Sequence, residues 1–278
     1  MALSKIDFDY ISRLAHTEAA LVLEAGKEYL VESRLGPVAL REGFASLADF
    51  IQQLRKEFKV AGLHHKAIDA LTTNETLFFR DFHPFEALRQ SILPLILGQR
   101  AEARRLTIWC AASSTGQEPY SLAMLLLEHF PQLASWSVSI FATDLSPTVL
   151  KLAKEGKYSQ FEVNRGLPAN YLVKYFTKDQ DKWCVKDQVK KMVEFRPINL
   201  VQPWPLMPPL DLVFIRNVMI YFDVETKKTI LKKIRTCLLP HGYLFLGTAE
   251  TTTNLDQSYE PVTFGKAVIY RARPGAAA

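Results

Sequence analysis

A chain of 278 residues with 48% hydrophobic residues and a formal net charge of +5 is long enough for more than one domain and has an ordinary soluble balance. This modest positive charge favours acidic partners in general and does not single out nucleic acid. Scattered cysteines without a C-x-x-C pair argue against a metal site, and the lack of any apolar run of ~18 residues or of a signal-peptide pattern predicts a cytoplasmic protein without membrane insertion.

The first part of the chain, residues 1–70, has the pattern of a small all-α domain. Ser46 and Asp49 resemble a helix cap, and apolar residues then recur with helical spacing. Core packing is the simplest explanation of such a stripe, so it indicates a helical domain and no binding site by itself. The stripe consists of Leu47, Phe50, Ile51, Leu54 and Phe58.

From residue 71 onward, short apolar runs alternate with helical segments. This alternation predicts an α/β domain over 71–278, with a parallel sheet covered by helices on both faces. Such sheets bind ligands at the carboxyl ends of their strands, near the point where strand order reverses. The expected strands are 106–111, 138–144, 192–198, 210–217, 244–250 and 266–272, and the expected helices are 118–129, 146–155 and 224–238.

At the start of this part, the run from Leu71 to Arg80 combines a polar cluster, aromatic residues and a cation at the junction between the two halves. Junctions between domains favour ligand clefts, although a solvated linker with a helix cap would show the same pattern.

The first expected strand is followed by a turn of small residues from Ala112 to Gly116, and then by a helix beginning near Glu118. Small residues let backbone N–H groups approach a ligand, and the N-terminus of a helix adds to this. Because the turn lacks the full G-x-G-x-x-G spacing, a ligand loop and a tight turn remain equally open. The absence of a Walker lysine argues against a phosphate-binding loop.

Asp144 ends the second expected strand. A doubly wound fold binds ribose hydroxyls with an acidic residue at this place, and one carboxylate can accept both hydrogen bonds. The alternative is that Asp144 complements the dipole of the helix that begins near Ser146. The turn of small residues after the first strand favours the ribose interpretation.

Arg216 and Asn217 come at the end of a buried strand. Polar groups at such a place are costly unless they are used or exposed, so a ligand site and a salt-bridged strand terminus are equally open.

Taken together, these segments resemble the chemotaxis receptor glutamate methyltransferases, the CheR family. The matching stretches occur in the family's order between residues 72 and 250, and the N-terminal helices fit the family's small helical domain less specifically. One departure is Gln117, where the family usually has Glu. The stretches are TTNETLFFRD, IWCAASSTGQEPYSLAM, FATDLS, VEFRPINL, DLVFIRNVMIYF and LPHGYLFLGTAE.

The resemblance implies a Rossmann-like class I methyltransferase sheet, a helical N-terminal domain that docks on receptors, and a small antiparallel β-subdomain inserted at about 157–193. It also implies S-adenosylmethionine as cofactor, S-adenosylhomocysteine as product and receptor glutamates as substrate. Arg80 and Tyr221 are assigned to the vicinity of the transferred methyl group. The cofactor contacts assigned by resemblance are Asn74, Thr76, Arg80, Glu118, Asp144, Asn199, Leu200, Arg216 and Asn217.

Two other functions remain as alternatives: a methyltransferase that acts on RNA, DNA or a small molecule, and a non-catalytic cofactor sensor or scaffold. Methyltransferases of base amino groups usually carry Asn/Asp-Pro-Pro-aromatic after the fourth strand, whereas here Pro208-Pro209 precedes that strand. A non-catalytic scaffold would be favoured by the loss of Arg80 or Tyr221, and both are present. We therefore expect a monomeric enzyme that acts on the acidic helical bundle of chemotaxis receptors and binds no nucleic acid.

The expected β-subdomain also predicts something about receptor binding. Some family members dock a peptide from the receptor's C-terminus there as an added strand. Residues 171–195 of this chain contain no glycine, and the central stretch 177–182 is charged. Since lysines on an exposed edge discourage strand addition, we expect methylation without a C-terminal tether peptide.

Overall fold

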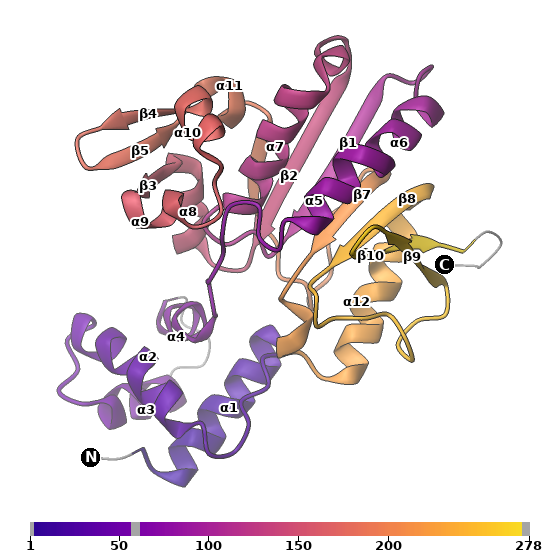
Figure 1. Ribbon diagram of the computed structural model, residues 1–278. Helices are drawn as coiled ribbons and strands as arrows, with labels where there is room; N and C mark the ends of the chain where they lie inside the picture. Colours follow the sequence, from indigo (N-terminus) through magenta and orange to yellow (C-terminus); the bar gives the residue numbers. More distant parts are fainter. Residues whose placement is uncertain (1–2, 57–61, 274–278) are drawn as a thin grey trace. The chain divides into compact units, whose positions relative to one another are not determined.

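The computed structural model describes residues 3–56 and 62–273 (Figure 1). Its contacts divide the chain into a helical unit, Met1–Thr73 with Tyr221–Thr226, and a sheet unit, Asn74–Ile220 with Lys227–Ala278. Across the described residues, no helix is long and apolar enough to cross a membrane.

The helical unit confirms the all-α fold expected for the N-terminal part. Ser46 caps α3 by accepting the Asp49 N–H at 3.1 Å, as the sequence suggested, and Ser4 caps α1 in the same way. Phe50 and Ile51 of the predicted stripe are buried, and Phe58 lies outside the described residues. The helices are α1 (Lys5–Ala19), α2 (Glu28–Arg41), α3 (Leu47–Lys56) and α4 (Leu63–Leu71).

The sheet unit is built on a seven-stranded sheet with the order β6-β2-β1-β7-β8-β10-β9. The pairs from β6 to β8 are parallel, and β10 pairs antiparallel with β8 and β9, which confirms the Rossmann-like prediction. Strand order reverses at β1, between β2 and β7. The strands are β1 (Arg105–Ala111), β2 (Ser137–Asp144), β6 (Val193–Pro197), β7 (Leu210–Ile215), β8 (Leu238–Leu246), β9 (Tyr259–Phe264) and β10 (Ala267–Ala272).

Successive residues of β1 face opposite sides of this sheet, as a strand buried on both faces requires. Ile108 and Cys110 belong to the main core, which also includes residues of the helices that follow β1 and β2. Trp109 faces the other side, where its ring packs edge-on against Trp204 with centroids 4.9 Å apart. The helices that flank the strands are α5 (His83–Ala87), α6 (Leu93–Gln99), α7 (Gln117–His129), α8 (Pro147–Glu155) and α12 (Val224–Cys237).

A second, three-stranded antiparallel sheet with the order β3-β5-β4 confirms the predicted β-subdomain (Figure 1). The rings of Tyr158 and Phe176 meet the Phe78 ring edge-on, at 5.0 and 5.7 Å, and so attach this sheet to the main core. The subdomain contains β3 (Lys157–Ser159), α9 (Gln160–Asn164), α10 (Ala169–Tyr175), β4 (Phe176–Asp179), β5 (Lys182–Val185) and α11 (Asp187–Lys190).

Candidate active site

The carboxylate of Asp144, at the end of β2, is buried and held by two backbone donors. Ser114 N–H binds its Oδ2 atom at 2.8 Å, and Ser146 N–H binds its Oδ1 atom at 3.0 Å. The second bond is the helix-terminus contact that the sequence left open. It does not exclude the ribose role, because an ionised carboxylate has about four lone-pair sites and can accept several hydrogen bonds.

The turn between β1 and α7 is strained in the way that ligand sites often are. Ala112 and Ser114 have φ values of 54° and 50°, in the left-handed region that side chains disfavour. Gly116, with φ 93°, is tightly enclosed: a Cβ there would lie 3.1 Å from the Cβ of Ala153. The Ser114 hydroxyl donates to the Asn74 carbonyl at 2.7 Å, which fixes the start of the sheet unit against this turn.

Arg216, directly after β7, forms a buried ion-pair network. Its guanidinium, only 2% exposed, donates to Glu118 at 2.7 Å, to Asp81 at 2.7 Å and to the Arg80 carbonyl at 2.8 Å. Burial raises the pKa of Glu118, and the charge of Arg216 opposes this rise. The salt-bridged strand terminus that the sequence left open is present, and it joins α7 to segment 80–81. It leaves the ligand interpretation of Arg216 untested.

A carboxylate that the sequence analysis did not single out joins the ends of β7 and β8. Glu250 Oε2 accepts the N–H groups of Asn217 at 2.8 Å and Gly247 at 2.6 Å, and Oε1 accepts that of Ile220 at 3.2 Å. The apolar pattern predicts Glu250 at the end of a strand, whereas β8 ends at Leu246. Glu250 is the first acidic residue after the apolar run of a parallel strand, and this position could have marked it as a candidate site residue.

Segment 74–82, which contains Arg80, lies beside the end of β7, because the Arg80 carbonyl accepts a hydrogen bond from Arg216. One donor of the Arg80 guanidinium binds the Glu75 carbonyl at 3.3 Å, and Thr76 is half-buried nearby in the chain. Phe79 and Asp81 have φ values of 47° and 68°, so this segment is also strained.

Asn199 and Leu200 lie in the loop after β6, which begins beside Asp144. The Ile198 N–H donates to the Asp144 carbonyl at 3.1 Å, and Asn199 Oδ1 accepts the Val201 N–H at 3.1 Å. The sheet unit therefore holds nine of the predicted residues. The tenth, Tyr221, groups with the helical unit, where its carbonyl accepts the Val22 N–H at 3.0 Å.

The residues present fit S-adenosylmethionine, which carries a ribose diol and cationic groups. Asp144 can accept from the diol, and Glu118 in the first turn of α7 is suited to a cation. Ser113 Oγ and Asn217 Oδ1 are buried near the ends of β1 and β7, and neither has a hydrogen-bond partner among the residues that the structure describes. Within those residues, no group of three or more His, Cys, Asp or Glu side chains could hold a metal ion.

Comparison with known proteins also indicates a methyltransferase that uses S-adenosylmethionine. The model of the CheR methyltransferase SAM-binding domain matches residues 74–268, and that of the CheR all-alpha domain matches residues 6–72. Chemotaxis protein methyltransferase 1 of Pseudomonas aeruginosa is 41% identical, covering 98% of this chain and 100% of the relative. A chemotaxis protein methyltransferase of Vibrio parahaemolyticus is 39% identical, with coverages of 98% and 99%. The chain therefore belongs to the CheR family of methyltransferases that use S-adenosylmethionine.

Proposed function

We propose that this enzyme transfers the methyl group of S-adenosylmethionine to glutamate side chains of chemotaxis receptors, forming glutamyl methyl esters. The main structural support is the buried Asp144 carboxylate, fixed by two backbone N–H groups next to the point where strand order reverses. The names of the relatives supply the chemotaxis context.

The proposed chemistry needs positioning more than proton transfer. S-adenosylmethionine supplies an electrophilic methyl group on a sulfonium. A glutamate side chain, with an ordinary pKa of about 4.3, is already an anion at neutral pH and needs no general base. Asp144 holds the ribose, and Glu118, kept in place by Arg216, faces the cationic end of the cofactor.

We assign Arg80 to holding the incoming carboxylate and Tyr221 to orienting it by a hydrogen bond. The role of both is to align the carboxylate oxygen with the methyl carbon and to exclude water. Too strong a hold would stabilise the bound substrate and slow the transfer, so neither residue acts as an acid or a base.

The test is incubation of the enzyme with methyl-labelled S-adenosylmethionine and cytoplasmic fragments of chemotaxis receptors. We expect base-labile label on receptor glutamates, as esters give. Arg80→Ala serves as the matched inactive variant, because it loses the guanidinium but not Asp144. Base-stable label, or equal label with the Arg80 variant, would contradict the proposal.

We also propose that the helical unit docks on the acidic receptor bundle and that the enzyme acts as a cytoplasmic monomer. The cations of this unit that could contact an acidic receptor are Lys27, Arg34, Arg41, Arg55 and Lys56. Three of them already have partners: Lys27 pairs with Glu24, Arg55 binds Asp7, and Arg34 donates to Thr73. Arg41 and Lys56 are exposed and are the better receptor contacts. Docking of this kind would weaken as salt rises, because ions screen exposed charges.

A further inference from the structure

The loop after β6 has neither helical nor strand structure up to Trp204, so its conformation depends on side-chain contacts. Its first residue, Ile198, is tied to the backbone of Asp144. Asn199 then closes a local turn by accepting the Val201 N–H.

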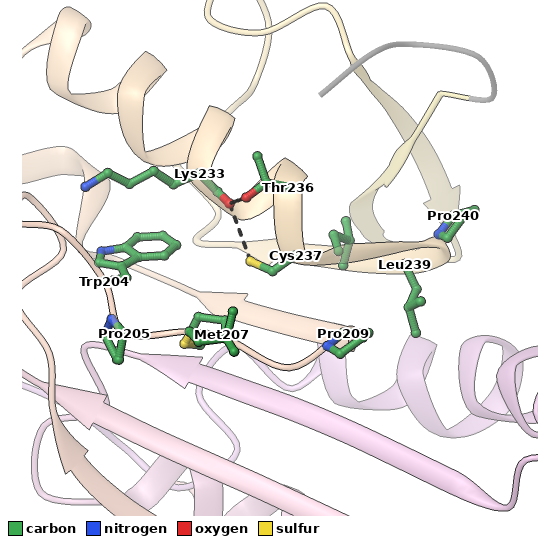
Figure 2. A pocket seen from close by; sticks show the side chains of 11 residues that line it. Trp204, Pro205, Met207, Pro209, Lys233, Thr236, Cys237, Leu239 and Pro240 are labelled. Carbon is green, nitrogen blue, oxygen red and sulfur yellow. Dashed lines mark hydrogen bonds between the residues drawn. The ribbon is translucent and has the colours of Figure 1, made fainter.

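The far side of this loop is held by α12. The Lys233 ammonium donates to the carbonyls of Leu200 at 3.2 Å and Gln202 at 2.9 Å. The Trp204 indole N–H donates to the same Leu200 carbonyl at 3.0 Å, and the ammonium lies 5.1 Å from the centroid of the Trp204 ring. Figure 2 shows Lys233 alongside Trp204, where both line a pocket of about 600 Å³.

Trp204 is also connected to the end of β2 through Trp109. Trp204 packs against Trp109 of β1, and the Trp109 indole N–H donates to the Thr143 hydroxyl at 2.9 Å. Thr143 directly precedes Asp144. The loop is thus fixed at one end to the Asp144 backbone and at the other to a Lys233–Trp204 pair whose contacts also reach β2.

Lys233 is an unusual anchor. Burial lowers its pKa, and the partners that the structure gives for its ammonium are two carbonyls and an indole face, with no carboxylate among the described residues. Lys233 is half-buried, and even partial removal of an ammonium from water is costly without compensation. A lysine placed only to cover the sheet would leave its charge in solvent.

The order of the strands indicates which part of the cofactor this loop meets. Asp144 ends β2, the turn with Gly116 follows β1 on one side of it, and β6 lies on the other side. With the ribose at Asp144 and the cationic end of the cofactor at Glu118 of α7, which follows β1, the base is directed to the other side, toward the loop after β6.

We propose that Lys233 and Trp204 are positioning residues that hold the loop 198–202 in the conformation that binds the adenine of S-adenosylmethionine. Neither residue needs to contact the cofactor. The inference rests on the proposed placement of the ribose at Asp144.

Calorimetric titration with S-adenosylhomocysteine tests this without any receptor. If the loop is competent only part of the time, the apparent Kd rises in proportion. Lys233→Met is expected to raise Kd about 5- to 30-fold, as loss of hydrogen bonds from a charged donor implies, with binding stoichiometry unchanged. Lys233→Arg restores part of the affinity, and Trp204→Phe, which keeps a ring but loses the N–H donor, gives a smaller rise.

Lys232→Met is the matched control, because Lys232 is the exposed neighbour of Lys233 on α12. The Kd of this variant for S-adenosylhomocysteine is expected to stay at the wild-type value. Wild-type affinity in both the Lys233→Met and Trp204→Phe variants would overturn the inference. So would a fall in stoichiometry at unchanged Kd, which would indicate partial unfolding. Asp144→Ala distinguishes a failure of this inference from a failure of the proposed ribose site. If Asp144→Ala also leaves Kd unchanged, the placement of the ribose at Asp144 is wrong.

Discussion

Asp144, to which we assign the ribose, also has a structural role, because its oxygens accept N–H groups from Ser114 and Ser146. Asp144→Ala should weaken binding of S-adenosylhomocysteine roughly 10- to 100-fold, as loss of hydrogen bonds to a charged group implies. Calorimetry measures this effect. Asp144→Asn, which keeps one oxygen acceptor, should lie between the wild type and the alanine variant. Unchanged affinity in a folded alanine variant would remove Asp144 from the site.

Glu250 should matter for the stability of the sheet unit, because its carboxylate accepts three backbone N–H groups. Glu250→Gln replaces one carboxylate oxygen by an N–H₂ group, so at least one of the Asn217, Gly247 and Ile220 N–H groups loses its acceptor. We expect a loss of about 1–3 kcal/mol in the free energy of unfolding, measured by chemical denaturation. The control is Glu260→Gln in the exposed pair with Arg271, where the loss should not exceed about 1 kcal/mol. Equal losses in the two variants would contradict this assignment.

The position of a site residue was predictable where one strand end fixes it, whereas its contacts were not predictable where the partners are distant in the sequence. Asp144 could be singled out because the end of the second strand is a known ribose position. Apart from the family resemblance, the sequence left the role of Arg216 open, because its partners Glu118 and Asp81 come from segments far away in the sequence. The role of Glu250 likewise depends on the neighbouring strand β7.

At the scale of elements, the start of α12 depends on Asp223. Its carboxylate accepts the Thr226 N–H at 2.8 Å and lies 2.9 Å from His16, and these contacts lower its pKa from 3.8 to about 2. Asp223→Ala should lower the free energy of unfolding by about 1 kcal/mol, the usual worth of a helix cap. Solvent screens much of the ion pair, because the side chain of Asp223 is 39% exposed.

The pH dependence of this effect has a defined sign. Because folding lowers the pKa of Asp223, its charge stabilises the folded state above about pH 4, and this contribution is lost as pH falls toward 2. The stability difference between wild type and Asp223→Ala, measured by denaturation at several pH values, should therefore shrink on acidification. Asp223→Asn keeps an oxygen that can cap the helix without a charge, so its stability should show less of this dependence. A difference that stays constant from pH 6 to 2 would contradict the assignment.

Elements were predictable where apolar runs are continuous. The parallel strands were found with small errors at their ends, whereas β8 stops at Leu246 and the expected continuation to Glu250 is a turn. β9 was not predicted, because its residues are mostly only partly buried and it contains Pro261, which edge strands tolerate.

At the scale of the whole molecule, the β-subdomain bears on receptor binding. β4 is an edge strand of only four residues, and the Lys178 ammonium lies 5.7 Å from the ring centroid of Trp183 on β5. A short, lysine-bearing edge is a poor template for an added strand. We therefore predict that the isolated C-terminal peptide of a receptor shows no micromolar binding in a titration. Deletion of that peptide should leave receptor methylation unchanged, and a loss of methylation would overturn the prediction.

The helical unit contains two stretches of sequence that lie far apart, because Tyr221–Thr226 groups with Met1–Thr73. Inside this unit, Val22 is hydrogen-bonded to the Tyr221 carbonyl and His16 is paired with Asp223. A chimaera between two relatives that is joined only at Thr73 would combine helices from one parent with a 221–226 segment from the other. Exchanging both stretches together keeps these contacts intact. Recombination within the family is therefore expected to retain matched combinations of the two stretches, with Tyr221 inherited alongside the N-terminal helices.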